Sequence, residues 1–170
     1  MIIGRRREKG LVSNAESITS RPGSQAVIAP ATWRDLNAVR HLEQVCFPKD
    51  AWPLWDLIGI LSFPNVVRMK AIVDGRLVGF IGVDIREKEN TAWIATVGVL
   101  PEYRGRGIAR MLLETSERQL KGIGQVKLSV RMSNEAAIRL YERQGYRRVG
   151  VWNRYYSDGE DGLVMEKSLR

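Results

Sequence analysis

The chain has 170 residues, of which 44% are hydrophobic and 27% are charged, a composition typical of one globular domain with a packed core. No apolar run approaches the roughly 18–20 residues that cross a bilayer, so we expect no membrane association, and the N-terminus lacks the apolar core of a secretory signal. The single cysteine, Cys46, permits no internal disulfide, which favours a cytoplasmic location. One histidine and one cysteine without clustered partners predict that there is no metal site.

The net charge of +8 is spread along the chain, and residues 1–25 contribute +3 of it in a stretch without hydrophobic periodicity. We therefore expect a basic, flexible arm at residues 1–25 and one folded domain at residues 26–170. A basic surface attracts anionic ligands or nucleic acid, so charge alone leaves a nucleic-acid or ribosome partner open.

The first half of the domain predicts a strand, two helices and a three-strand meander. A short strand at residues 27–29 precedes the N-cap Thr32, and apolar residues then recur at helical spacing from Trp33 to Val45. A second, short helix follows Pro53 and runs toward Leu61. Strands are predicted at residues 66–73, 77–87 and 92–99, with an Asp-Gly turn between the first two.

The second half alternates helices and strands. Helices are predicted at residues 107–121 and 134–144, and strands at residues 125–131, 146–156 and 163–168. The whole order is β-α-α-β-β-β-α-β-α-β-β. A meander followed by strand–helix–strand units predicts an α/β (α+β) fold, in which helices cover a mixed sheet.

The loop at residues 104–107 carries the most informative residues. Gly105 and Gly107 let the backbone approach a ligand closely, and the first amides of the next helix are unpaired at the positive end of its dipole. Arg104 and Arg106 add positive charge, so the loop is suited to phosphate. A solvated basic turn is one alternative, and a partial G-x-G-x-x-G fingerprint with Arg110 in place of its third glycine is another.

A further interpretation comes from the longer pattern. The run Val99-Leu-Pro-Glu-Tyr-Arg-Gly-Arg-Gly-Ile-Ala109 resembles motif A of the GNAT superfamily of N-acetyltransferases, [Q/R]-x-x-G-x-[G/A], with its preceding V-x-P-x-Y-R. The run Asn134-Glu-Ala-Ala-Ile-Arg-Leu-Tyr-Glu-Arg-Gln-Gly-Tyr146 resembles the second coenzyme A (CoA) segment of the family, N-x-x-A-x-x-L-Y-x-x-x-G-[F/Y]. The resemblance covers residues 27–169.

The resemblance implies the GNAT fold, a mostly antiparallel sheet of six to seven strands with about four helices, and acetyl-CoA as co-substrate without a metal. It implies that Asn134 contacts the pantetheine and that Tyr141 is the general acid for the departing thiolate; seven residues apart, they share one face of a helix. The residues expected to bind the cofactor are Val97, Val99, Arg104, Gly105, Arg106, Gly107, Ile108, Ala109, Asn134 and Tyr141. The first two belong to the strand whose amides would stabilise the oxyanion, and Gly98 is expected to distort that strand. For Tyr141 a packing role, and for Asn134 a capping role, are the alternatives.

The general base is a departure from the family pattern. The RimI type, which acetylates the N-termini of ribosomal proteins, usually has Glu where this chain has Ser129, a residue that cannot act as a base near neutral pH. A water chain to Asp84 or Glu102 is one alternative. The other is an acceptor that needs little help, since an α-amine of pKa ~7.7–8.0 is partly neutral at pH 7.5 whereas a lysine is not.

The C-terminal third resembles the N-terminal acetyltransferase branch. Asn153-Arg-Tyr-Tyr156, followed by Glu160-Asp-Gly-Leu-Val-Met165, resembles the ending R-x-Y-Y…E-D-A-x-x-M. This implies that Tyr155 and Tyr156 contact the first residues of a peptide substrate, with the segment up to Trp52 as the opposite wall; a cross-strand aromatic pair is the alternative.

We therefore expect an acetyl-CoA-dependent N-acetyltransferase that modifies the N-terminus of a protein or peptide, with a ribosomal protein among the candidates. Two alternatives stay open: a GNAT enzyme acting on lysine or a small amine, and a CoA- or ribosome-binding module without catalysis. We do not expect direct binding to nucleic acid.

Overall fold

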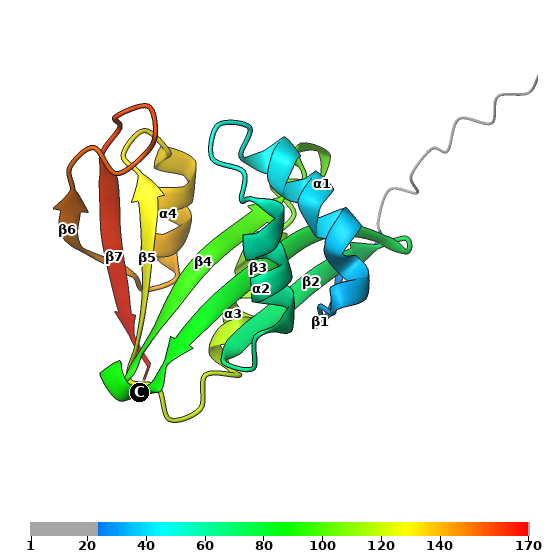
Figure 1. Cartoon of the computed structure of the whole chain (residues 1–170), viewed down its shortest axis with the longest axis horizontal. Coiled ribbons are helices and arrows are strands. Elements are labelled where there is room, and N and C mark those ends of the chain that lie inside the picture. The colour runs from blue at the N-terminus through cyan, green and yellow to red at the C-terminus, as the bar shows by residue number, and fades with distance from the viewer. Residues whose placement is uncertain (1–23, 170) are drawn as a thin grey trace, which may run out of the picture.

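The computed structural model describes residues 24–169, so most of the expected basic arm lies outside the described residues. Seven strands form one sheet (Figure 1): β1 (Val27–Pro30), β2 (Val66–Val73), β3 (Arg76–Arg86), β4 (Thr91–Val99), β5 (Gln125–Arg131), β6 (Arg147–Trp152) and β7 (Gly162–Ser168). Four α-helices accompany it: α1 (Leu36–Cys46), α2 (Leu54–Ser62), α3 (Ile108–Glu117) and α4 (Glu135–Arg143). The element order and the mixed α/β class agree with the prediction from sequence.

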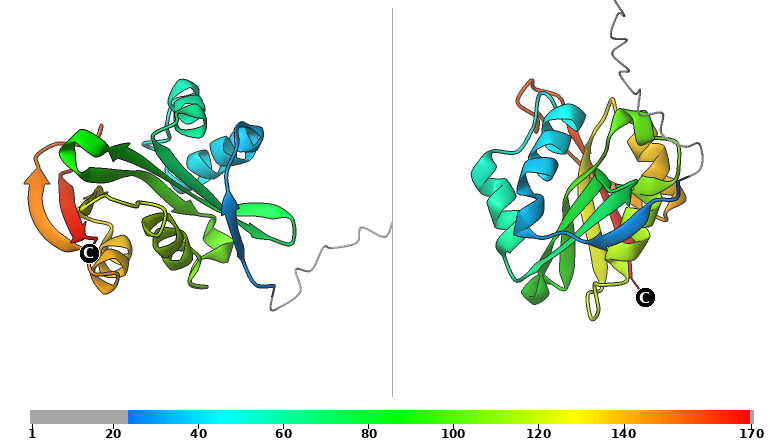
Figure 2. Two further views of the ribbon diagram at one scale, coloured as in Figure 1. Left: turned by 90° about the horizontal axis from the view of Figure 1, so that it is seen from below. Right: turned by 90° about the vertical axis from the view of Figure 1, so that its right-hand side faces the viewer.

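The sheet has the strand order β1-β2-β3-β4-β5-β7-β6, and every neighbouring pair except β4–β5 is antiparallel. Helices α1 and α2 lie on one face and α3 and α4 on the other (Figure 2). Because both faces of β3 are covered, its middle is an almost continuous apolar run, and Val78, Phe80 and Ile81 are fully buried.

The central feature of the sheet is a split between β4 and β5. These strands pair only from Thr91 to Ile94, opposite Gln125 to Leu128, and then diverge toward their C-terminal ends (Figure 1). A bulge in β4 marks the same point, because Gly82 pairs with Thr96 and Val83 with Ile94, which leaves Ala95 without a partner on β3. The C-terminal half of β4 therefore has a hydrogen-bonded neighbour on one side only.

Gly98 does not distort β4, contrary to the expectation from sequence. It pairs regularly with Phe80, and the irregularity lies at Ala95 instead. The glycine serves packing, since a Cβ at this position would lie 2.9 Å from Leu42 Cδ2 and 3.2 Å from Cys46 Sγ. The absence of a side chain lets α1 approach the sheet closely.

Three predicted elements differ in detail, and the first is the helix predicted at residues 107–121, which ends at Glu117. The predicted strand 146–156 ends at Trp152, because the chain turns through Arg154 at φ 52° and places Tyr155 and Tyr156 in the loop before β7. The face of α1 that was predicted to be buried is only partly so. Trp33 and Val45 are exposed, whereas Val39, Leu42 and Glu43 are buried. The predicted apolar residues are spaced three apart, but a helical turn has 3.6 residues, so each successive residue lies further round the helix and away from the core.

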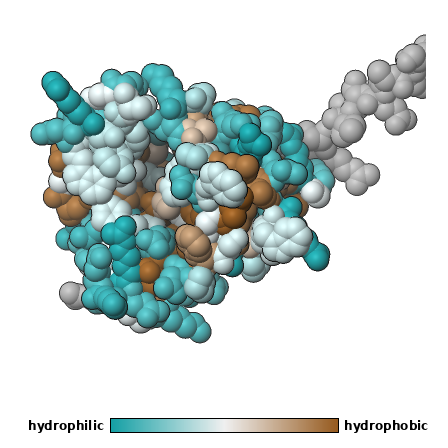
Figure 3. Space-filling model, viewed as in Figure 1, coloured by the Kyte–Doolittle hydropathy of each residue, from teal (hydrophilic) through white to brown (hydrophobic). Residues whose placement is uncertain are grey.

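The outer face of the molecule shows the same division into two halves. Figure 3 shows a hollow between the part built from α1 and α2 and the part built from β5, β6 and β7, with apolar side chains gathered over α2. The large apolar residues exposed on α2 and at its C-cap are Leu54, Trp55 and Phe63. No helix among residues 24–169 has the length and apolar character to span a membrane.

Candidate active site

The loop between β4 and α3 presents unpaired backbone amides. Gly105 and Gly107 have φ angles of 75° and 76°, in the left-handed region, and Gly107 is an N-cap without a side-chain acceptor. Within residues 24–169 nothing accepts a hydrogen bond from the amides of residues 105–110; the next donor is Met111, which bonds the carbonyl of Gly107. A row of free N–H groups at the positive end of a helix dipole is a site for phosphate oxygens.

The two arginines of the loop are used differently from the expectation that both would face a phosphate. Arg104 Nε donates a 2.9 Å hydrogen bond to the carbonyl of Val99, and so fixes the loop to the end of β4. Arg106 donates to the carbonyl of Glu102 and lies over the Tyr103 ring, with 5.1 Å between its Cζ and the ring centroid. Only Arg104 lines the groove described next.

A long groove of about 1330 Å³ begins at this loop and runs along α4. The predicted cofactor residues that line it are Val97, Val99, Arg104, Gly105, Gly107, Ile108, Ala109, Asn134 and Tyr141. Of the predicted set only Arg106 does not. The groove thus joins the end of β4, the start of α3 and one face of α4 into a single surface for an extended ligand.

Helix α4 contributes an amide and a phenol. Asn134 Oδ1 accepts a 3.2 Å hydrogen bond from the amide of Ala137, so Asn134 caps the helix and also lines the groove. Tyr141 is 6% exposed and packs edge-on against Tyr146, with 5.7 Å between ring centroids. Burial raises the pKa of Tyr141, so its hydroxyl keeps its proton at neutral pH and can donate it.

A small cavity of about 180 Å³ occupies the split between β4 and β5 and meets the long groove at Tyr141. Trp52 and Tyr156 line it, as does Ser129, whose Oγ is buried without a hydrogen-bond partner among the described residues. Tyr155 does not line it: this side chain is exposed and packs against Trp152 with the two rings tilted relative to each other. Of the three residues predicted for the substrate, the structure brings two together.

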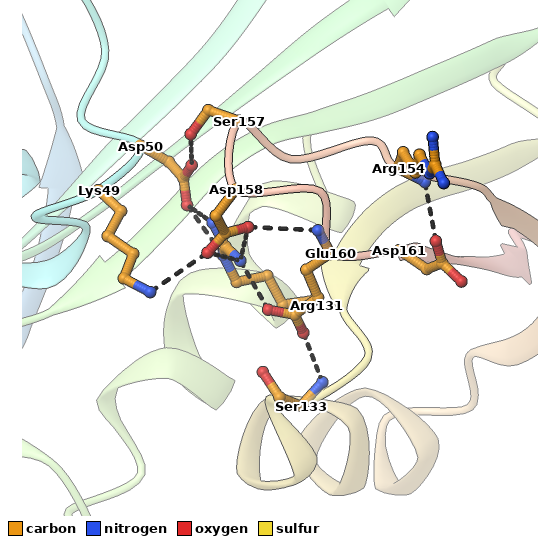
Figure 4. A network of polar contacts seen from close by, with 9 residues as sticks. All are labelled: Lys49, Asp50, Arg131, Ser133, Arg154, Ser157, Asp158, Glu160 and Asp161. Carbon is orange, nitrogen blue, oxygen red and sulfur yellow. Dashed lines mark hydrogen bonds and ion pairs between the residues drawn. The ribbon is translucent and has the colours of Figure 1, made fainter.

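Arg131 joins the walls of the small cavity, a role that sequence reasoning missed. It lies at the end of β5 and forms ion pairs with Asp50 (2.6 Å), Asp158 (3.0 Å) and Glu160 (2.6 Å), as Figure 4 shows. Asp50 comes from the α1–α2 segment, and the other two carboxylates come from the β6–β7 loop. The acidic run at 158–161 was the available signal, but the sequence does not say which cation it meets.

The same guanidinium orders an aromatic side chain. Arg131 lies over the Tyr156 ring, with its Cζ 4.1 Å from the centroid, a distance typical of a cation–π contact. The hydrogen bond from Arg131 lowers the pKa of Asp158 to about 2, so this carboxylate is ionised at every pH at which the fold is expected to persist. The β6–β7 loop and its tyrosine are therefore held against the cavity.

The two carboxylates expected to receive a proton through water lie elsewhere. Asp84 pairs with Arg86 and Glu102 with Arg76, all on the exposed surface. Neither lines the long groove or the small cavity, and Asp84 lies near the C-terminal end of β3. Within the described part of the chain, no three His, Cys, Asp or Glu side chains are grouped as a metal ion would require.

Comparison with known proteins identifies the family. The model of the acetyltransferase (GNAT) family matches residues 36–146, a span that holds the loop, the long groove and α4. The chain belongs to the GNAT family. It is therefore an N-acetyltransferase that uses acetyl-CoA as co-substrate, and the unpaired amides of residues 105–110 fit the diphosphate of that cofactor.

Individual relatives of this GNAT enzyme include N-alpha-acetyltransferases. The chain is 35% identical to the N-alpha-acetyltransferase RimI of Mycobacterium tuberculosis, over 82% of this chain and 90% of the relative. It is 33% identical to NAA10, the catalytic subunit of the N-terminal acetyltransferase A complex of Arabidopsis thaliana, over 84% of this chain and 78% of the relative. Among solved structures, the ribosomal-protein-S18-alanine N-acetyltransferase of Escherichia coli superposes with a TM-score of 0.77 at 27% identity, over 85% of this chain and 94% of that one.

Proposed function

We propose that this GNAT enzyme transfers the acetyl group of acetyl-CoA to the N-terminal α-amine of a protein or peptide. The observation that carries the proposal is the junction at Tyr141, where the long groove meets a small cavity open between β4 and β5. A thioester lying in the groove would present its carbonyl at this junction, and an amine entering from the cavity would reach it from the other side.

In the proposed complex, acetyl-CoA lies along the long groove. The amides of residues 105–110 would hold the diphosphate, and Asn134 would contact the pantetheine beside its capping bond. When bound, acetyl-CoA supplies an activated acyl group with a thiolate as leaving group. Backbone amides of β4 between Val97 and Val99 that point away from β3 are free to donate to the carbonyl oxygen as negative charge develops.

We assign Tyr141 as the group that protonates the leaving sulfur. Its hydroxyl lies where the groove and the cavity meet, and no described residue takes its hydrogen bond. Burial raises the pKa of Tyr141 and keeps the phenol protonated until the thiolate forms. A positioned donor lowers the cost of expelling a thiolate.

The size of the small cavity supports a small first residue on the acceptor. A volume of about 180 Å³ leaves room for the amine and a short side chain, with Trp52 and Tyr156 as walls. Several relatives are named N-alpha-acetyltransferases, and the solved E. coli structure is named for the alanine of ribosomal protein S18, which supports a protein N-terminus as substrate and a ribosomal protein as one candidate.

A peptide panel tests the proposal. Peptides that begin with Ala, Ser, Gly, Leu or Trp, matched peptides with a blocked N-terminus and one internal lysine, and free polyamines would each be incubated with the enzyme and acetyl-CoA. Mass spectrometry should show acetylation at the α-amine, fastest for the small first residues. Acetylation confined to lysine or to polyamines would contradict the proposed acceptor while leaving the GNAT chemistry intact.

A further inference from the structure

Helix α1 carries a buried carboxylate that its packing does not require. Glu43 is 1% exposed and lies on the inward face of α1, between the buried Leu42 and the half-buried Cys46. No lysine or arginine of the described chain forms an ion pair with it. Burying an ionised group without a cation costs stability, so a residue of this kind in a cleft points to a function.

Only one of the two carboxylate oxygens of Glu43 has a side-chain hydrogen-bond partner among the described residues. Its Oε1 accepts a 2.5 Å hydrogen bond from the Thr96 hydroxyl on β4, next to the bulge. Its Oε2 is buried and has no partner among residues 24–169. The Thr96 hydroxyl on β4 thus orients the carboxylate, with the backbone amide of Trp52 also close to it.

Glu43 lines the small cavity, and so does the other described side chain with an unpartnered oxygen there, Ser129. The first belongs to α1 and the second to β5, so they contribute to the cavity from different elements. Ser129 occupies the position where the resemblance predicted a base, and Glu43 supplies a carboxylate to the same space. A bound amine, or a water beside it, would meet the hydrogen-bonding need of Glu43 Oε2, whereas Ser129 lies beside the Tyr156 hydroxyl, where it opposes the rise that burial causes in the pKa of Tyr156.

We propose that Glu43, oriented by Thr96, is the proton acceptor for the amine of the acceptor substrate, in place of the residue that Ser129 replaces. The inference rests on the proposed function for the identity of the amine, not for the existence of the transfer. Glu43 Oε2 takes one proton from the ammonium, directly or through water in the cavity. The neutral nitrogen then forms a bond to the acetyl carbon, the carbon–sulfur bond breaks, and Tyr141 gives a proton to sulfur and regains one from the new amide nitrogen.

The charges around Glu43 suit this role. Burial raises the pKa of Glu43, although the hydrogen bonds from the Thr96 hydroxyl and the Trp52 backbone amide oppose the effect. The pKa of this carboxyl is therefore closer to that of an amine than the pKa of an exposed glutamate would be. The titratable groups that face the same region are Cys46 and Arg104 on the groove side and Asp50, Arg131, Tyr141 and Tyr156 in the cavity. Arg131 is already neutralised by three carboxylates, so Glu43 keeps its capacity to take a proton.

The first test is the pH dependence of Glu43→Gln. For the acceptor that the wild-type enzyme acetylates best, kcat should fall about 100-fold at pH 7 while the Kd for CoA stays within twofold. The wild-type rate should decline on the acid side as Glu43 gains a proton. In the variant, kcat should instead keep rising with pH until the pKa of the acceptor amine is reached, since only the neutral amine then reacts. Asp84→Asn, which changes an exposed carboxylate, is the matched control and should behave as wild type.

Thr96→Val is the second variant, and it tests Glu43 as the proton acceptor even if Glu43→Gln folds poorly. Loss of the hydroxyl removes the bond that favours the ionised carboxylate, so the acid limb should move to higher pH while the plateau rate is kept. An unmoved limb in Thr96→Val, or a wild-type rate and limb in Glu43→Gln, would overturn the assignment.

The acceptor used in these assays separates this inference from the proposed function. If lysine or a polyamine proves to be the acceptor, the proposed substrate class is wrong, and the same variants test Glu43 on that amine. If CoA binds but no amine is acetylated, both proposals fail.

Discussion

At the scale of single residues, Tyr141 is the side chain to which we assign the protonation of the leaving sulfur. We predict that Tyr141→Phe lowers kcat about 100-fold and changes the Kd for CoA by less than threefold, because the ring and its packing on Tyr146 remain while the proton donor is lost. Steady-state kinetics beside CoA titration measure both quantities. An equal loss of rate and affinity would make Tyr141 a packing residue.

Gly107 tests the phosphate site without touching the chemistry. We predict that Gly107→Val abolishes measurable CoA binding, because the new side chain would stand at the free amides and Val is strained at φ 76°. Gly122→Val is the matched control: this glycine has φ 79°, also has open space around it, and lies far from the groove. The control should lose similar stability in thermal unfolding and keep CoA affinity. Equal affinities in the two variants would contradict the assignment.

Residues whose chemistry is local were predictable from sequence. Gly105 and Gly107 precede a helix, and Asn134 and Tyr141 share a helix face, so short spacings reveal them. Glu43 and Arg131 were not predictable, because their partners are far away in the sequence: Thr96 is 53 residues from Glu43. The available signal was a glutamate among the buried residues of α1. It was missed because the buried face was predicted to include Trp33 and Val45, which are exposed.

At the scale of elements, Arg131 joins the α1–α2 segment, β5 and the β6–β7 loop. We predict that Arg131→Gln raises KM for the peptide about tenfold, since the loss of a hydrogen-bonded charge releases both walls, while the Kd for CoA is unchanged. Arg139→Gln, which removes an exposed ion pair on α4, is the control and should leave KM unaltered.

The network also has a defined pH window. The folded-state pKa of Asp158 is lowered to about 2, so the stabilisation from its pair with Arg131 is fully present above about pH 4 and is lost as the pH falls through about 2. The effect of Arg131→Gln on KM should therefore be constant between about pH 6 and pH 9. A KM ratio that changed strongly in that range would mean that another group titrates with the network.

The order of elements was predictable, and their ends and pairing were not. Hydrophobic period and turn residues revealed strands and helices, since both are local properties. The position of β7 between β5 and β6, and the termination of β6 at Trp152, depend on which strand edges meet in space. The bulge fell at Ala95 rather than at Gly98 for the same reason: the register with β3 places it.

For the whole molecule, the mixed sheet with helices on both faces agrees with the predicted GNAT fold, and the family match extends over residues 36–146. The division into an arm at residues 1–25 and a domain at residues 26–170 stays a prediction. The tertiary fold brings four separate segments, 43–52, 94–114, 128–144 and 156–160, to the two adjoining cavities. The loop at residues 104–107 indicated the phosphate site by itself, but the small cavity needs all four segments and could not be predicted from any one of them.

The parting of β4 from β5 has a consequence for hydrogen–deuterium exchange. A central strand normally exchanges slowly along its whole length, because neighbours bond it on both sides. Here residues 91–94 of β4 are flanked on both sides, whereas residues 95–99 have β3 alone. We expect mass spectrometry to show fast deuterium uptake by part of 95–99 in the free enzyme, and slower uptake there once acetyl-CoA is added. The middle of the sheet would then report occupancy directly, with no need for turnover.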